Sequence, residues 1–120
     1  MRTLIFSILL LFATPLFSAV DENYGLVESQ PVKVGGGIQG PARAQAYLAR
    51  LRGPKGEATS YFRQGSCCHF KTPNALIGDS GLLDRYQVSY PGLAKPIIIY
   101  INNYDGAEVF PVKGLKFVAK

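Results

Sequence analysis

The stretch DRYQVSYPGLAKPIIIYIN, residues 84–102, decides the fold because it contains two strands and the turn between them. In its first part Tyr86, Val88 and Tyr90 alternate with polar residues, which is typical of a half-buried strand. Pro91-Gly92 suits a type II turn, since glycine accepts the positive φ that this turn requires. The run from Ile97 is apolar on both faces and therefore predicts the most buried strand of an antiparallel sheet.

Upstream, the segment GPARAQAYLARLRGP, residues 40–54, predicts one helix from Pro41 to Arg52. Pro41 suits the first turn, where its missing N–H loses no hydrogen bond, and Gly53 followed by proline ends the helix. An apolar stripe recurs at helical spacing and comprises Ala44, Tyr47, Leu48 and Leu51. Because a helix this short is not stable alone in water, we expect the stripe to pack on the sheet.

The remaining strand signals are shorter. Residues 32–34 and 58–65 each read as a strand, and one or two more are expected around Phe110 and Phe117. The order is strand, helix and then several strands joined by turns. The sequence therefore predicts an α+β fold, with one helix packed on a small antiparallel sheet of about four strands.

Residues 1–19 have the three parts of a secretory signal peptide. Arg2 precedes an apolar run from Leu4 to Phe12, and small residues follow up to Ala19. The apolar run is shorter than the roughly 20 residues that span a membrane, so no transmembrane segment is expected after signal cleavage. We predict an exported protein, periplasmic or secreted, with a single small α+β domain over residues 20–120.

The charge pattern does not single out a class of partner. The formal net charge is +5, but no two Lys or Arg residues are adjacent. A mild positive balance favours anionic surfaces in general. Nucleic acid is not an expected partner, because there is no basic stripe with interleaved aromatic residues. The oligomeric state is not indicated.

Gly35, Gly37 and Gly40 have the spacing of a dinucleotide-binding fingerprint between a strand and a helix. An antiparallel sheet in a domain this short cannot build the two halves of that fold, so no cofactor is expected. A flexible entry to the helix, or a close approach of two backbones, is the simpler explanation of the glycines. Arg43, near the start of the helix, is a candidate for binding an anionic group there.

Both cysteines, Cys67 and Cys68, are adjacent, and the only histidine, His69, follows them. A metal site is not expected, because zinc needs three or four protein ligands and no second cluster exists. An oxidising compartment favours a disulfide between the neighbours, although their Cα atoms, about 3.8 Å apart, are closer than an ordinary disulfide prefers. Two buried thiols, an intermolecular disulfide and a redox-active pair remain open alternatives.

The motifs GSCC (residues 65–68), TPN (residues 72–74) and GLLD (residues 81–84) resemble a family of small exported bacterial proteins of unsettled function. The resemblance extends over nearly the whole chain after the signal segment, although His69 stands where that family often has proline. Some of its members carry the label 2-dehydro-3-deoxyphosphooctonate aldolase. That enzyme is a β/α barrel of about 250 residues, so the resemblance implies export and the paired cysteines but transfers no catalytic residue.

The loop-rich segment from Gly65 to Asp84 is the predicted binding region, because ordered loops on a sheet scaffold carry most binding groups. Its candidate binding residues are His69, Lys71, Asn74 and Asp84. The main functional hypothesis is a small binding or envelope-associated protein whose ligand or envelope partner is unknown. The alternative hypothesis is a thiol-dependent redox or nucleophilic enzyme at Cys67 and Cys68.

Overall fold

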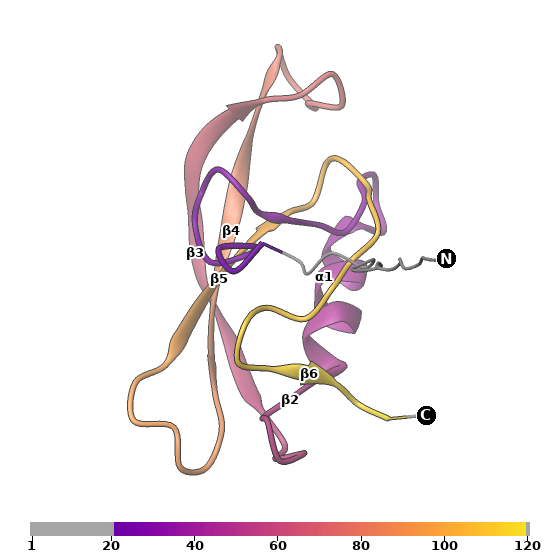
Figure 1. The fold of residues 1–120 in the computed structure, drawn as a ribbon. Coiled ribbons are helices and arrows are strands. Elements are labelled where there is room, and N and C mark those ends of the chain that lie inside the picture. The colour runs from indigo at the N-terminus through magenta and orange to yellow at the C-terminus, as the bar shows by residue number, and fades with distance from the viewer. Residues whose placement is uncertain (1–20, 120) are drawn as a thin grey trace, which may run out of the picture.

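The main sheet of the fold has four strands in the spatial order β1-β5-β4-β3 (Figure 1). The structure is a computed structural model that describes residues 21–119, so the predicted signal peptide lies outside the described residues. The elements in chain order are β1 (Val32–Lys33), α1 (Gly40–Ala49), β2 (Leu51–Arg52), β3 (Ser60–Lys71), β4 (Ser80–Ser89), β5 (Ile97–Asn102) and β6 (Lys116–Phe117).

The predicted α+β class is confirmed, with one helix lying on one face of this sheet (Figure 1). Strands β3, β4 and β5 pair antiparallel, as their hairpin connections require. Strand β1 instead pairs parallel to β5. Parallel strands need a long connection, and the chain between β1 and β5 is long enough to provide it. The sheet is therefore mixed rather than wholly antiparallel. A second, two-stranded sheet joins β2 to β6.

The helix ends at Ala49, three residues before the predicted end at Arg52. Leu51 and Arg52 form β2 and pair with Phe117 and Lys116. The prediction was wrong here because pairing with a segment far along the chain overrides the helical pattern. Leu51 nevertheless completes the apolar stripe, and all four stripe residues are buried, as predicted.

The hydrophobic core lies between α1 and the facing side of the sheet. Cross-strand partners share a face, so Val32, Ile101 and Asp84 form one row across β1, β5 and β4, and Ile99 and Tyr86 form the next. Leu48 of α1 packs into this core and is fully buried. Asp84 therefore stands on the core-facing side of the sheet, in the same row as the apolar residues Val32 and Ile101.

Strand β3 continues through the cysteine segment to Lys71, where we expected a loop-rich region. The expectation of a loop between Gly65 and Asp84 is correct only for residues 72–79. Two register shifts interrupt the pairing of β3 with β4, one between Arg63 and Gly65 and one between Cys67 and His69. Such bulges bend a strand, and the far end of the β3–β4 hairpin curves toward the helix side (Figure 1).

Candidate functional site

Cys67 and Cys68 are joined in a disulfide within β3. Their Cα atoms lie 3.7 Å apart, and the peptide bond between them is trans. Cys68 is the bulged residue and has a φ of 56°, the only positive φ of a non-glycine residue in the described part of the chain. Of the alternatives that the sequence left open, the structure shows the disulfide between neighbours. The ring holds Cys68 in a conformation that an unconstrained cysteine rarely adopts.

The bulge at Cys68 sets which side chains of β3 face which side of the sheet. Cys67 pairs with Leu83 and His69 with Leu82, so β4 advances by one residue while β3 advances by two. A one-residue shift in register turns every later side chain to the other face. The bulge thus places Phe70 opposite Gly81, where it meets Tyr104 edge to face at 5.5 Å between ring centroids.

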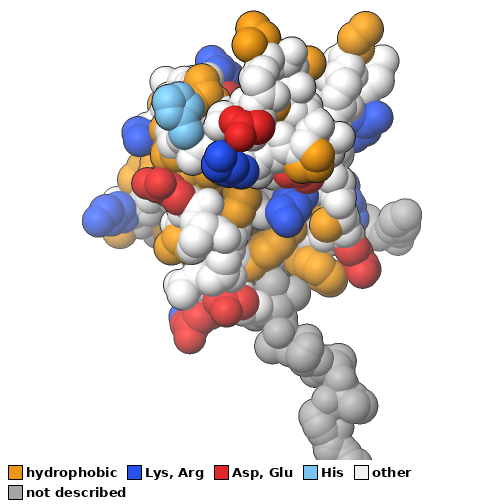
Figure 2. All heavy atoms as spheres, turned by 90° about the horizontal axis from the view of Figure 1, so that it is seen from above, with side chains coloured by type: hydrophobic (Ala, Val, Ile, Leu, Met, Phe, Trp, Pro, Cys, Tyr) orange, Lys and Arg blue, Asp and Glu red, His pale blue; other side chains and the backbone are white. Residues whose placement is uncertain are grey.

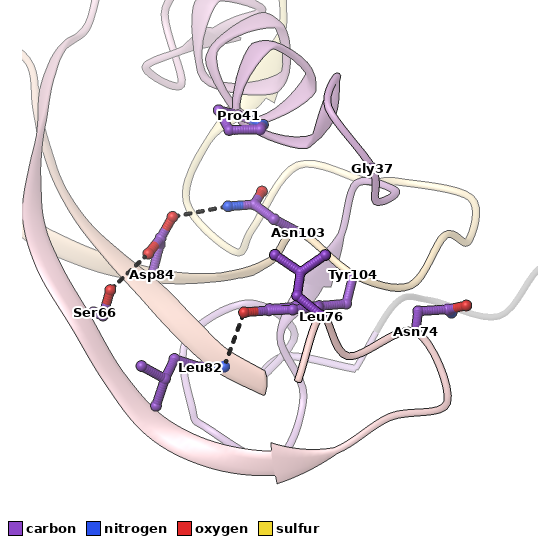
Figure 3. Close-up of a pocket in the computed structure, with 9 residues that line it drawn as sticks. All are labelled: Gly37, Pro41, Ser66, Asn74, Leu76, Leu82, Asp84, Asn103 and Tyr104. Carbon is purple, nitrogen blue, oxygen red and sulfur yellow. Dashed lines mark hydrogen bonds between the residues drawn. The ribbon is translucent and has the colours of Figure 1, made fainter. Parts of the chain in front are cut away.

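A pocket lies between this curved hairpin, the start of α1 and the turn after β5 (Figure 3). We call it the Asp84 pocket, and its volume is about 250 Å³. Its lining residues are Gly37, Pro41, Ser66, Asn74, Leu76, Leu82, Asp84, Asn103 and Tyr104. Three segments that are far apart in the sequence therefore contribute to one site.

The Asp84 carboxylate is the only ionisable carboxyl group that lines this pocket, and 15% of its side chain is exposed. Its Oδ1 accepts hydrogen bonds from Arg63 Nη2 at 3.0 Å and Ser66 Oγ at 3.3 Å. Its Oδ2 accepts one from Asn103 Nδ2 at 2.8 Å. The hydrogen bond to Asp84 also raises the pKa of the Arg63 guanidinium, so the two groups form a charged pair with little net charge.

Asn103 has a carbonyl oxygen without a partner. Its Oδ1 is buried and accepts no hydrogen bond from the described residues. The amide orientation follows from Asp84, since only the Nδ2 group can donate to the carboxylate. The oxygen consequently points away from Asp84, on the side of Pro41 (Figure 3). Buried acceptors in folded proteins are nearly always satisfied, so this unpaired oxygen is unusual.

Asp105 ties the hairpin loop to the turn after β5. Its carboxylate accepts hydrogen bonds from Thr72 Oγ1 at 2.6 Å, Asn74 Nδ2 at 2.8 Å and Asn102 Nδ2 at 2.9 Å. The bonds from Thr72, then Asn102, then Asn74 lower the pKa of Asp105 because they stabilise its charged form. This cluster lies beside the Asp84 pocket and fixes Asn74, one of its lining residues.

Two glycines let α1 begin next to this turn. A Cβ on Gly36 would come 2.5 Å from the carbonyl oxygen of Tyr104, and a Cβ on Gly40 would come 2.9 Å from that of Asn103. The glycine-rich segment therefore serves a close approach of two backbones, one of the two explanations that the sequence left open, and this approach forms one side of the pocket.

The structure brings together two of the predicted binding residues, Asn74 and Asp84. His69 is exposed and lines a neighbouring hollow that shares Leu76, Leu82 and Tyr104 with the Asp84 pocket. Lys71 pairs with Asp79 at 3.0 Å, with both side chains largely exposed. Arg43 donates from Nη1 to the carbonyl oxygen of Gly36 at 2.6 Å, so it braces the glycine segment and does not line the Asp84 pocket.

Sequence reasoning did not select Ser66 or Asn103 as candidate site residues, nor Asp105, which accepts three side-chain hydrogen bonds. The available signal was the segment NNYDG, residues 102–106, which follows the most apolar strand directly. Polar residues at the end of a buried strand often line a site, but these residues read equally well as a turn. Within residues 21–119, no group of three metal-ligating side chains lies together.

The face of the molecule seen in Figure 2 carries charges of both signs. Lys, Arg, Asp and Glu side chains are mixed over it, without a large patch of one sign.

Among the described residues, no helix combines the length and the apolar character needed to cross a membrane.

No protein-family model, curated protein or solved structure matches this chain.

Proposed function

We propose that the protein is a small exported, envelope-associated binding protein whose ligand lies in the Asp84 pocket. The observation that carries the proposal is the Asp84 carboxylate, which lines the cavity with 15% of its side chain exposed. Its Oδ2 accepts one hydrogen bond from the described residues, from Asn103 Nδ2, so it has a lone pair left for a donor on a ligand.

The way in which the pocket is built supports the same proposal. Asp84 is held by Arg63, Ser66 and Asn103, and the neighbouring loop is held by Asp105, so the polar groups are positioned before any ligand arrives. A preorganised site loses less entropy on binding. The disulfide at Cys68 contributes through the bulge that curves the hairpin over the pocket.

Amide NMR of the isotope-labelled protein with a library of small fragments tests the binding function. We expect fragments to shift the amide signals of Leu82, Asn103 and Tyr104 and to leave those of β2 and β6 in place. If no fragment moves the pocket signals, the protein does not use this cavity for binding. Mass spectrometry of the exported protein tests the localisation, with a mature start near Ala19 or Val20 expected.

A second candidate function is thiol–disulfide exchange at Cys67 and Cys68. The observation in its favour is that both residues are only partly buried in the described structure. Exchange with a dithiol reductant would convert the disulfide to two thiols while the reductant becomes a disulfide, with two electrons and two protons transferred. An alkylation titration after reduction separates the candidates, because a thiolate pKa well below about 8.5 favours exchange.

A further inference from the structure

We propose that the Asp84 pocket takes one uncharged, hydroxyl-rich ring, such as a single neutral sugar residue. This inference rests on the proposed function, because it names the ligand class of that same site. Four properties of the pocket carry it: its size, its surplus of acceptors, its charge balance and its apolar wall.

The size of the pocket suits a single small ring. A volume of about 250 Å³ lies below the roughly 300–1,000 Å³ of sites for drug-sized ligands. Each water molecule occupies about 30 Å³ in the liquid, so the space corresponds to only a handful of waters. A six-membered ring with its substituents fits such a space, whereas a nucleotide or a peptide of several residues does not.

The polar groups of the pocket need donors from the ligand. Asp84 Oδ2 accepts one hydrogen bond from the described residues, from Asn103 Nδ2, so it has a lone pair left. A ligand hydroxyl group donates to this oxygen, and a neighbouring hydroxyl accepts in return from the hydroxyl of Tyr104, which also lines the pocket (Figure 3). A carboxylate or phosphate ligand would place its oxygens against the Asp84 carboxylate and would be repelled.

The charge balance disfavours a cationic ligand. The Asp84 carboxylate already pairs with the Arg63 guanidinium at 3.0 Å. An ammonium group would have to displace this partner or share the carboxylate with it, and like charges close together are unfavourable. A neutral hydroxyl adds a hydrogen bond without disturbing the pair.

The remaining wall of the pocket is apolar and exposed. Leu76 is 85% exposed and Leu82 is 40% exposed, although both are large hydrophobic residues. They line the pocket together with Pro41 and the Tyr104 ring. A sugar ring has an apolar C–H face as well as hydroxyl groups, so binding it would cover this wall while its hydroxyls reach Asp84. Binding sites commonly combine such an apolar lining with a few placed polar groups.

The test is a set of amide NMR titrations with matched probes. The neutral probes are the methyl glycosides of glucose, galactose, mannose and N-acetylglucosamine. The ionic probes are acetate, glucuronate, inorganic phosphate and methylammonium. We expect at least one neutral glycoside to shift the signals of Leu82 and Asn103 in a saturable way, and the ionic probes to leave them unchanged at equal concentration and ionic strength.

Three variants show whether the predicted atoms are responsible. Asn103→Ala removes the amide that holds Asp84 Oδ2 in place, so the carboxylate is less well oriented and glycoside binding should weaken by about tenfold. Leu76→Ser changes only an exposed wall residue, so it should fold normally and still weaken binding. Asn23→Ala is the matched control, because it removes an exposed amide that does not line the pocket and should bind like the wild type.

The outcomes separate this inference from the proposed function. If ionic probes shift the pocket signals while no neutral glycoside does, the ligand class is wrong and the binding function stands. If no probe of any kind shifts them, both proposals fail. If a glycoside binds but Leu76→Ser and Asn103→Ala bind it equally well, the sugar lies elsewhere and the inference is overturned. A soluble methyl glycoside compared with beads bearing a polysaccharide that ends in the same sugar distinguishes a free sugar from an envelope glycan as the source.

Discussion

Replacing Asp105 by alanine should destabilise the protein strongly, although the residue lies in a turn. Asp105 accepts hydrogen bonds from Thr72 and Asn102, which are 3% and 1% exposed. In the variant both side chains keep buried donors without a partner, whereas the third donor, on exposed Asn74, can turn to water. At about 1–3 kcal/mol for each buried unsatisfied donor, the expected loss is roughly 2–6 kcal/mol. Small domains have only about 5–15 kcal/mol in total.

Urea denaturation followed by far-ultraviolet circular dichroism, without reductant, measures this loss. With a slope of about 1–3 kcal/mol per M, the midpoint should fall by roughly 1 M or more. Asp79→Ala is the matched control, because it removes a carboxylate from the same loop region whose only ion pair, with Lys71, is exposed. Exposed pairs contribute about 0–1 kcal/mol, so its midpoint should barely move. If both variants have the same midpoint, the Asp105 cluster does not hold the loop to the turn.

The pH dependence of the difference in unfolding free energy between the wild type and Asp105→Ala provides a second check. The pKa of Asp105 is lowered in the folded protein, first by Thr72 and then by Asn102 and Asn74. Its stabilising contribution is therefore fully present above the unfolded pKa of about 3.9 and is lost as the pH falls through the folded pKa. The gap in unfolding free energy between wild type and Asp105→Ala should be largest near neutral pH and should narrow below about pH 4. A gap that widens on acidification would contradict the assignment.

Three further variants test the core, the hairpin contact and the disulfide. Leu48→Ala removes a fully buried side chain and should lower the unfolding free energy by about 2–5 kcal/mol, measured by the same urea titration. Gly81→Ala puts a Cβ 2.7 Å from the Tyr104 ring, so the ring must move, which should shift its NMR signals and cost about 1–3 kcal/mol. Cys67→Ser with Cys68→Ser frees the bulge, so amide exchange in β3 beyond the bulge should accelerate while β5 stays protected. Cys67→Ser with Cys68→Gly is its control, and its β3 amides should exchange more slowly than those of the double-serine variant, because glycine takes a positive φ readily. If the amides of the double-serine variant exchange no faster than those of the wild type, the disulfide is not what holds the bulge.

The site was only partly predictable, and the cysteine segment shows why. Its adjacent cysteines and the expected export indicated a neighbour disulfide as one of several alternatives. Nothing in the sequence showed that Cys68 would be a bulge within a strand, because bulges depend on how the partner strand aligns. Asp84 and Asn74 were selected from a segment expected to be a loop. Asp84 in fact lies on a strand, and its pairing with Ile101 decides that its side chain is on the core-facing side of the sheet.

The amino-acid sequence by itself determined the apolar stripe of the helix, the two strands on either side of Pro91-Gly92 and the α+β class. These features follow from the local spacing of apolar residues. Only the tertiary structure decided the parallel pairing of β1, the conversion of Leu51 and Arg52 from helix to strand, and the meeting of Ser66, Asp84 and Asn103. These features need segments that are distant in the chain to come together. Their free energy comes from contacts that local periodicity does not encode, so the pocket became visible only in the folded molecule.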